Sequence, residues 1–254
     1  MISAVFFDFD HTLYSHGSQS VPQSARDAIK ALQKKGILCV LATGRHLVEL
    51  RHFPDSLNLG LDGYVTIDGQ LCLDRNLHTI CSNEITGRLK EDLLRLFDEK
   101  EYHVILIEED RMYANVFRES GNSSLATVRH GVGTYTGNPL YMGVVYIEPE
   151  REAWLAGRLS GCSLLRWGSP GVDVVPSGRS KVAGIQSFLK YHGLEGSQYI
   201  AFGDGLNDIA MIESAPIGVA MGNAVDDLKD VADYVTTSVD EDGVCNALIH
   251  FGLI

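Results

Sequence analysis

Short runs of apolar residues that stop abruptly at polar ones recur along the chain. Residues 2–8, 37–42 and 199–202 are the clearest of these runs. Continuous apolar runs of this length predict strands that are buried on both faces of a sheet, as in parallel sheets. The first of them ends in Asp8-Phe9-Asp10, so two carboxylates follow the first strand with one residue between them.

The segments between these runs have helical periodicity. Residues 22–36 begin with Pro22, carry an apolar stripe at helical spacing and end at Gly36. Strand, helix and strand within about 40 residues match the size of a βαβ unit, whose crossover should be right-handed. Further helices are predicted at 46–53, 181–191, 208–214, 225–231 and 244–251, and further strands at 63–67, 217–220 and 234–235, with a turn at Asp68-Gly69. We therefore expect an α/β domain with a doubly wound parallel sheet.

The middle of the chain has a different pattern, which predicts a second domain inserted into the first. Helices are expected at 84–100 and 149–160, and strands at 103–107, 141–147, 163–167 and 172–175, whereas 115–138 is rich in Gly, Ser, Asn and Thr and gives no clear element. This mixture is typical of an α+β module that can bury its own sheet face. The predicted domains are 1–82 together with 177–254, and an insert at 83–176.

Composition narrows the possible partners and the location. The 254 residues carry a net charge of −12, which argues against binding to nucleic acid or to an anionic membrane. No apolar run approaches the roughly 18 residues of a membrane helix, and the N-terminal run is too short for a signal peptide. The five cysteines are scattered without a CxxC pair, so we expect reduced thiols, no zinc site and a cytoplasmic protein.

Acidic residues gather at the strand ends. Asp8 and Asp10 follow the first strand, and Gly203-Asp204-Gly205-Leu206-Asn207-Asp208 follows a late one. The carboxyl ends of parallel strands share one edge of a sheet, where ligands of open α/β folds bind. Carboxylates brought together repel each other unless a cation intervenes, and Mg²⁺ suits an all-oxygen set. The sequence therefore predicts a Mg²⁺ site near Asp8, Asp10, Asp204 and Asp208.

Two further segments suit a phosphoryl group at the same edge. Thr43-Gly44-Arg45 follows the second strand and offers a hydroxyl and backbone amides, and Lys181 begins a helix after Ser180. A cation, a lysine and oriented donors are the groups that stabilise a transferring phosphoryl group. Taken singly, each segment is also compatible with an ordinary turn or a solvated helix start. Their occurrence together, in this order, favours a phosphoryl-transfer site.

The four segments resemble the motifs of the haloacid dehalogenase-like superfamily. Asp8-Phe9-Asp10-His11-Thr12 matches its DxDxT motif, Thr43-Gly44-Arg45 its second, Lys181 its third and residues 203–208 its GDGxND motif. The set is similar to the Cof-type, sugar-phosphatase-like subfamily. That resemblance covers the whole chain and implies that the insert is an α+β cap domain on a Rossmann-like core.

The resemblance also implies roles for the motif residues. Asp8 would be the nucleophile that forms an aspartyl-phosphate, and Asp10 the general acid and base. Thr43 and Lys181 would complete the catalytic set, while Gly44, Arg45 and Asn207 would contact phosphate or substrate. Asp8, the Asp10 backbone carbonyl, Asp204 and Asp208 would surround Mg²⁺, with Asp208 as a direct ligand or just behind one. These assignments are expectations at this point.

Two residues depart from the family pattern. His11 stands where the family usually has Gly, and histidine tolerates the left-handed backbone region better than most residues. Asp68 stands where the family usually has Asn, so no role is carried over to it.

The predicted function is Mg²⁺-dependent hydrolysis of a phosphomonoester of a small metabolite, such as a sugar phosphate. A phosphomutase on the same fold is one alternative, and it would need an activating bisphosphate. A non-enzymatic phospho-Asp module is another, although such a module has no use for the acid Asp10.

Overall fold

Two compact units make up the protein. The computed structural model describes residues 1–53, 55–117, 131–167 and 171–254. The core unit comprises Met1–Arg45, Phe53–Ser82 and Ser180–Ile254, and the inserted unit comprises His46–His52 and Asn83–Arg179. The functional domains expected from the sequence, 1–82 with 177–254 and 83–176, stay a prediction.

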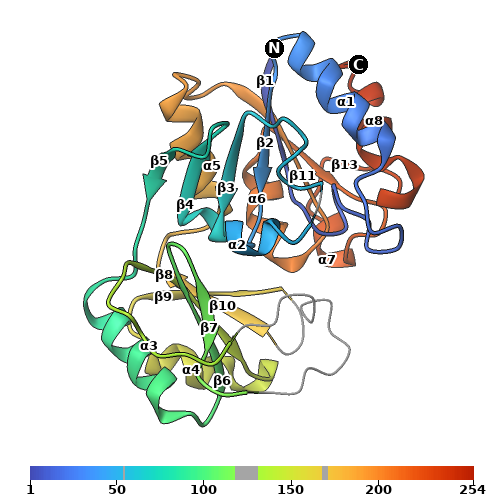
Figure 1. The fold of residues 1–254 in the computed structure, drawn as a ribbon. Helices are drawn as coiled ribbons and strands as arrows, with labels where there is room; N and C mark the ends of the chain where they lie inside the picture. Colours follow the sequence, from blue (N-terminus) through green and yellow to red (C-terminus); the bar gives the residue numbers. More distant parts are fainter. Residues whose placement is uncertain (54, 118–130, 168–170) are drawn as a thin grey trace. The chain divides into compact units, whose positions relative to one another are not determined.

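An eight-stranded sheet forms the centre of the core unit (Figure 1). Its strands, in spatial order, are β13 (Tyr234–Val235), β12 (Ile217–Ala220), β11 (Gln198–Gly203), β1 (Ile2–Phe7), β2 (Leu38–Ala42), β3 (Gly63–Thr66), β4 (Leu71–Asp74) and β5 (Thr79–Ser82). All neighbours from β13 to β3 are parallel, and β4 and β5 continue the sheet antiparallel. The central strand β1 has four successive buried residues at its end, as its continuous apolar sequence predicts.

Helices cover both faces of this sheet. The helices are α1 (Gln23–Lys34), α5 (Lys181–Tyr191), α6 (Ile209–Ser214), α7 (Asp226–Lys229) and α8 (Gly243–His250). On one face, Cys39 of β2 contacts the Ile29 carbonyl of α1, and Cys39 pairs with Val5 of β1. Phe6 points to the other face, where its ring packs edge-on against Phe188 of α5. The prediction of a doubly wound α/β fold is therefore confirmed.

The inserted unit is built on a five-stranded antiparallel sheet. Its strands, in spatial order, are β7 (Met112–Ala114), β6 (His103–Glu108), β8 (Leu140–Tyr146), β10 (Gly171–Pro176) and β9 (Cys162–Arg166). Its helices are α2 (Leu47–Leu50), α3 (Gly87–Glu99) and α4 (Glu152–Arg158). This is the mixed α+β content that the changed hydrophobic pattern predicts.

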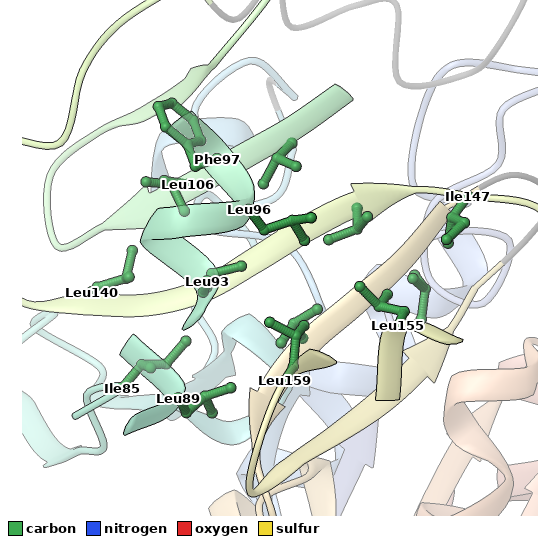
Figure 2. Packing of buried hydrophobic residues seen from close by; sticks show 14 of the residues in the cluster. Ile85, Leu89, Leu93, Leu96, Phe97, Leu106, Leu140, Ile147, Leu155 and Leu159 are labelled. Carbon is green, nitrogen blue, oxygen red and sulfur yellow. The ribbon is translucent and has the colours of Figure 1, made fainter. Parts of the chain in front are cut away.

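One face of this sheet is closed by apolar side chains from α3 and α4. Figure 2 shows Leu93 and Leu96 of α3 and Leu155 of α4 in this cluster, with Leu106 of β6. The packing is tight, because a Cβ built on Gly143 of β8 would lie 2.8 Å from both methyl carbons of Leu93. The inserted unit thus has its own apolar core.

Several local features differ from the sequence-based expectation. The strands β5 and β7 were not expected: β5 contains no buried residue and so no apolar alternation, and β7 has only three residues. The helix expected at 149–160 begins as a 3₁₀ turn, Pro149–Arg151, and ends at Arg158. Of the stretch 115–138, residues 118–130 lie outside the described part of the chain. Among the described residues, no helix has both the length and the apolar character needed to cross a membrane.

Candidate active site

The polar strand ends of the core unit lie level with one another. Phe7 of β1 pairs with Leu41 of β2 and with Phe202 of β11, so Asp8, Ala42 and Gly203 follow at the same height. The Asp8 amide donates a hydrogen bond to the Phe202 carbonyl at 2.9 Å. The parallel register therefore brings the first and last motifs together, as expected for the carboxyl edge of an open sheet.

A buried cluster forms around the first residue of α5. The Lys181 ammonium donates to Asp8 Oδ1 at 2.6 Å and to Asp208 Oδ1 at 2.7 Å. All three side chains are almost completely buried. Oxygens of Asp8, Asp204 and Asp208 also lie within 4.8 Å of one another. We call Asp8, Lys181, Asp204 and Asp208 the buried cluster.

Asp208 fixes the loop that presents Asp204. Its second oxygen, Oδ2, accepts hydrogen bonds from the backbone amides of Asp204 and Gly205 at 3.0 and 3.1 Å. Both oxygens of Asp208 therefore already have protein donors, one from Lys181 and two from the loop. This arrangement favours Asp208 as a residue that orients Asp204 over a direct metal ligand.

Negative charge exceeds positive charge in the buried cluster. Burial and the neighbouring Asp208 carboxylate raise the pKa of Asp8 well above its ordinary value, against the opposing effect of Lys181. Burial and Asp208 also raise the pKa of Asp204 to about 7. Burial alone would lower the pKa of Lys181, but Asp208 and Asp8 raise it. Three carboxylates facing one ammonium leave a deficit of positive charge, and a divalent cation fits this all-oxygen donor set.

Asp10 belongs to a separate group of side chains. Arg45 Nε donates to Asp10 Oδ2 at 2.6 Å and Arg45 Nη2 donates to Asp10 Oδ1 at 2.8 Å, which makes a two-pronged ion pair. His16 Nε2 lies 2.7 Å from the same Oδ1. Burial works against ionisation here, but the bonds from His16 and Arg45 prevail and hold the pKa of Asp10 well below its usual range. We call Asp10, Arg45 and His16 the Asp10 cluster.

Backbone contacts shape the loop that follows β2. The Thr43 hydroxyl accepts a hydrogen bond from the Arg45 amide at 3.1 Å, and the Thr43 carbonyl accepts one from the Asp68 amide at 3.2 Å. The Asp68 side chain is fully buried, and a Cβ on Gly44 would lie 3.3 Å from both of its carboxylate oxygens. Gly44 therefore lets the loop lie directly against Asp68, whose charge also acts on Lys181.

Two glycines allow α5 to approach the sheet closely enough to deliver Lys181. A Cβ on Gly69 would lie 2.2 Å from the Ser180 carbonyl oxygen, and one on Gly184 would lie 2.5 Å from Val65. The Ser180 carbonyl is a backbone group and cannot move aside, and a Cβ on Gly184 would also lie 2.8 Å from the backbone Cα of Gly69. The start of α5 is thus placed by the contact of Gly69, in the turn between β3 and β4, with Ser180 and Gly184.

The structure groups some of the predicted site residues and separates others. Asp8, Lys181, Asp204 and Asp208 come together, whereas the Asp10 carboxylate contacts Arg45 and His16. Arg45, expected at phosphate, pairs with Asp10 in this structure. Asn207 is half-buried in the 3₁₀ turn Leu206–Asp208, and the roles of Thr43, Gly44 and Asn207 stay predictions.

Sequence reasoning missed His16 and carried no role over to Asp68. His16 lies in a polar loop with no motif around it, so no local pattern identifies it. His11 has φ of 55°, the left-handed conformation that the sequence predicted histidine to tolerate. Asp68, with φ of 48°, is drawn into the site by the turn between β3 and β4.

Comparison with known proteins agrees with this geometry. The model of the haloacid dehalogenase-like hydrolase family matches residues 5–138 and 147–248. The matched residues include all four motif segments, from Asp8 to Asp208. The chain belongs to the haloacid dehalogenase-like hydrolase family.

Individual relatives extend over nearly the whole chain. The provisionally named phosphatase YkrA of Bacillus subtilis is 33% identical over 262 residues, which cover 98% of each protein. The solved structure of the phosphatase BT1666 of Bacteroides thetaiotaomicron matches with a TM-score of 0.88 and 33% identity over 100% of this chain and 96% of that one. The subclass IIB sugar phosphatase BT4131 matches with a TM-score of 0.84 and 30% identity over 99% and 100%. The predicted Cof-type resemblance and the assignment as a phosphatase are confirmed.

Proposed function

We propose that this phosphatase hydrolyses a phosphomonoester of a small metabolite, with a sugar phosphate as the first candidate, through an aspartyl-phosphate on Asp8 and with Mg²⁺ as cofactor. The observation that carries the proposal is the buried cluster, in which a lysine bridges Asp8 and Asp208 beside Asp204. The sugar-phosphate candidate rests on the likeness to BT4131, which is described as a sugar phosphatase.

Asp8 is the nucleophile in this proposal because it is the acid at the end of the central strand. Its carboxylate oxygen attacks phosphorus, and the bond from phosphorus to the ester oxygen breaks. The Lys181 ammonium, 2.6 Å from Asp8 Oδ1, offsets the negative charge that gathers between the carboxylate and the phosphoryl group. Thr43 and the Gly44 amide hold phosphoryl oxygens from the loop after β2.

Asp8, the Asp10 backbone carbonyl and Asp204 would hold Mg²⁺, and Asp208 would orient Asp204. When bound, the ion neutralises phosphoryl and carboxylate charge and so lets two anions approach each other. Mg²⁺ suits this site because the buried cluster has more carboxylates than positive charges and because its potential ligands are all oxygen atoms.

Asp10 moves the protons of the two half-reactions. In the first, it gives a proton to the ester oxygen as the alcohol leaves. In the second, it takes a proton from the water that attacks phosphorus, so that phosphate leaves and Asp8 is restored. Arg45 and His16 keep Asp10 ionised in the substrate-free arrangement, which suits the second step. The first step requires Asp10 to be protonated when substrate is bound.

The proposal further assigns the insert, residues 83–176, as the cap that selects the leaving group. The core motifs contact only the phosphoryl end of a substrate, so another part of the chain has to recognise the alcohol. The inserted unit has its own sheet and apolar core, which suits an independent recognition layer. Location in the cytoplasm stays a prediction from cysteine usage.

A panel of phosphorylated metabolites tests the activity. Purified protein, first treated with EDTA, is assayed for phosphate release with and without added Mg²⁺. We expect Mg²⁺-dependent release from a subset of sugar phosphates. Transfer of phosphate between positions of a sugar bisphosphate without release would favour a mutase instead, and release unaffected by EDTA would contradict the metal assignment.

Replacing residues 83–176 by a short linker tests the cap. We expect the shortened protein to hydrolyse 4-nitrophenyl phosphate but to lose discrimination among the metabolites of the panel. If it kept the substrate ranking of the full chain, the insert would not be the specificity element.

A further inference from the structure

The Asp10 carboxylate is bound by Arg45, which belongs to the second motif, and by His16, which the family motifs do not include. Oδ1 receives Arg45 Nη2 at 2.8 Å and His16 Nε2 at 2.7 Å, while Oδ2 receives Arg45 Nε at 2.6 Å. An ionised carboxylate can only accept hydrogen bonds, so His16 Nε2 carries a proton in this arrangement. His16 thus donates to the oxygen that Arg45 also binds.

Counting acceptor positions identifies the oxygen that is left for chemistry. Each carboxylate oxygen offers two lone pairs. Both positions on Oδ1 are taken, by Arg45 and His16, whereas Oδ2 has one donor among the residues that the structure describes. A proton that Asp10 gives or receives therefore has its place on Oδ2, while Oδ1 remains bound to its two donors throughout.

His16 is itself held in place. Its ring lies edge-on against Tyr14, at 5.2 Å between centroids, and against Phe53, at 6.4 Å. The Arg45 guanidinium lies over the same Phe53 ring, 4.4 Å from its centroid. Phe53 is thus a common support for both donors to Asp10, and it is buried. Side chains fixed by packing in this way hold their partners more accurately than solvated ones do.

His11 adds a second support on the outer side. Its ring centroid lies 4.5 Å from that of His16, and its left-handed backbone conformation is fixed by the turn after Asp10. The His11 carbonyl accepts a hydrogen bond from the Asn223 amide group at 2.9 Å, and the His11 amide donates to the Tyr14 carbonyl. His11, which stands where the family usually has Gly, therefore packs against His16, which lies outside the motifs.

We infer that His16 is a positioning residue for acid–base catalysis, which saturates Asp10 Oδ1 so that Oδ2 is the oxygen that exchanges the proton with the substrate. This inference rests on the proposed role of Asp10. Without His16, each oxygen of Asp10 keeps one lone pair free beside its bond from Arg45, so the proton can lie on either oxygen and point in more than one direction. Proton transfer is sensitive to such misplacement, since the donor has to lie within hydrogen-bond reach of the ester oxygen.

The leaving group distinguishes this role from a structural one. Departure of a sugar alkoxide needs a proton, whereas 4-nitrophenolate leaves without one. Values of kcat/KM report the steps up to the departure of the alcohol, so they are insensitive to the later attack of water. The measured quantity is the ratio of kcat/KM for 4-nitrophenyl phosphate to kcat/KM for the sugar phosphate that is hydrolysed fastest in the panel.

His16→Phe keeps a ring on Phe53 and removes the donor. We expect the ratio to rise roughly tenfold or more, and by less than in Asp10→Asn, where the whole acid contribution of about 10²–10⁴-fold is lost. His16→Gln keeps an N–H donor and should leave the ratio within about threefold of that of the unaltered protein. His78→Phe is the matched control, since it removes a histidine 3.4 Å from Asp74 in the turn between β4 and β5.

Circular dichroism and urea unfolding accompany each variant. If the role of His16 were purely structural, kcat/KM would fall equally for both substrates. An unchanged ratio in His16→Phe therefore overturns the inference. An equal rise of the ratio in His16→Gln overturns it as well, because the donor is retained there. If Asp10→Asn also left the ratio unchanged, the proposed acid role of Asp10 would fail, which is a different result from failure of the role of His16 alone.

Discussion

The buried cluster and the Asp10 cluster place the same kind of side chain in opposite electrostatic settings. Asp8 lies among other carboxylates with one ammonium beside it, and burial raises its pKa. Asp10, with 28% of its side chain exposed, faces a guanidinium and an imidazole, and its pKa is lowered. One cluster lacks positive charge, whereas in the other the Arg45 guanidinium balances the single carboxylate. The comparison indicates that the buried cluster needs an added divalent cation and that the Asp10 cluster does not.

The largest effect should follow from changing the nucleophile. Asp8→Asn retains size and shape but removes the attacking oxygen, so phosphate release should fall by at least about 10⁴-fold for every ester, whatever its leaving group. The check is initial-rate phosphate release with a sugar phosphate and with 4-nitrophenyl phosphate, on protein whose circular dichroism matches that of the unaltered chain. Near-normal turnover would show that the two clusters have been assigned the wrong roles.

Removing the positively charged side chain of each cluster should lower the stability of the protein by different amounts. Lys181→Met leaves Asp8 and Asp208 buried without a counter-ion and should lower the free energy of unfolding by about 3–5 kcal/mol in EDTA at pH 8. Arg45→Met should cost less, about 1–2 kcal/mol, because Asp10 is partly solvated and keeps His16. Urea unfolding measures both. Equal losses would mean that burial does not distinguish the clusters.

Metal affinity should depend on the buried cluster and hardly on the Asp10 side chain. Asp204→Ala should weaken Mg²⁺ binding by more than the roughly 10–100-fold that loss of an outer partner costs. Asp10→Ala should lower the rate more than the affinity, because Asp10 is expected to hold Mg²⁺ through its backbone. Calorimetric titration of both variants gives the answer. The reverse order would overturn the metal assignment.

The smallest effect should be on how stability varies with pH. The folded-state pKa of Asp204, about 7, lies above its ordinary value of 3.8, so the folded protein binds more protons between these values. Its contribution should make the metal-free protein more stable as the pH falls from about 8 to 5. Asp10, with a lowered pKa, contributes nothing over this range. Added Mg²⁺ should stabilise more at pH 8 than at pH 5.

Urea unfolding in EDTA, with and without Mg²⁺ in matched samples, tests this dependence. Asp204→Asn is the control, since it cannot titrate and should show a smaller slope. Stability that falls with falling pH over the same range would contradict the charge deficit of the buried cluster.

The two clusters also differ in how far the sequence predicts them. Asp8, Asp204 and Asp208 directly follow strands or the turns after them, and the ends of parallel strands share an edge whatever the side chains do. The proximity of these three carboxylates was therefore predictable from the positions of the apolar runs alone. Lys181 was predictable as a helix start, although its depth of burial depends on the contact of Gly69 with Ser180.

The partners of Asp10 were not predictable in this way. His16 reaches Asp10 because residues 11–15 form a tight turn, and because Phe53 supports both His16 and Arg45. Those contacts depend on side-chain conformation and on a residue 37 positions further along the chain (53 − 16). Periodicity carries no information about either. For the same reason the sequence identified the helix 46–53 but not that residues 46–52 group with the inserted unit.

The close contact of Gly69 and Gly184 with their neighbours has a consequence for the genetics of this protein. A random library screened for loss of phosphatase activity should return substitutions at these two positions as often as substitutions at Lys181, since any added side chain displaces the start of α5. Neither glycine carries a reactive group. A map of inactivating substitutions would therefore outline the contact of Gly69 with the start of α5 as clearly as it outlines the acids, and activity alone would not distinguish the two groups of positions.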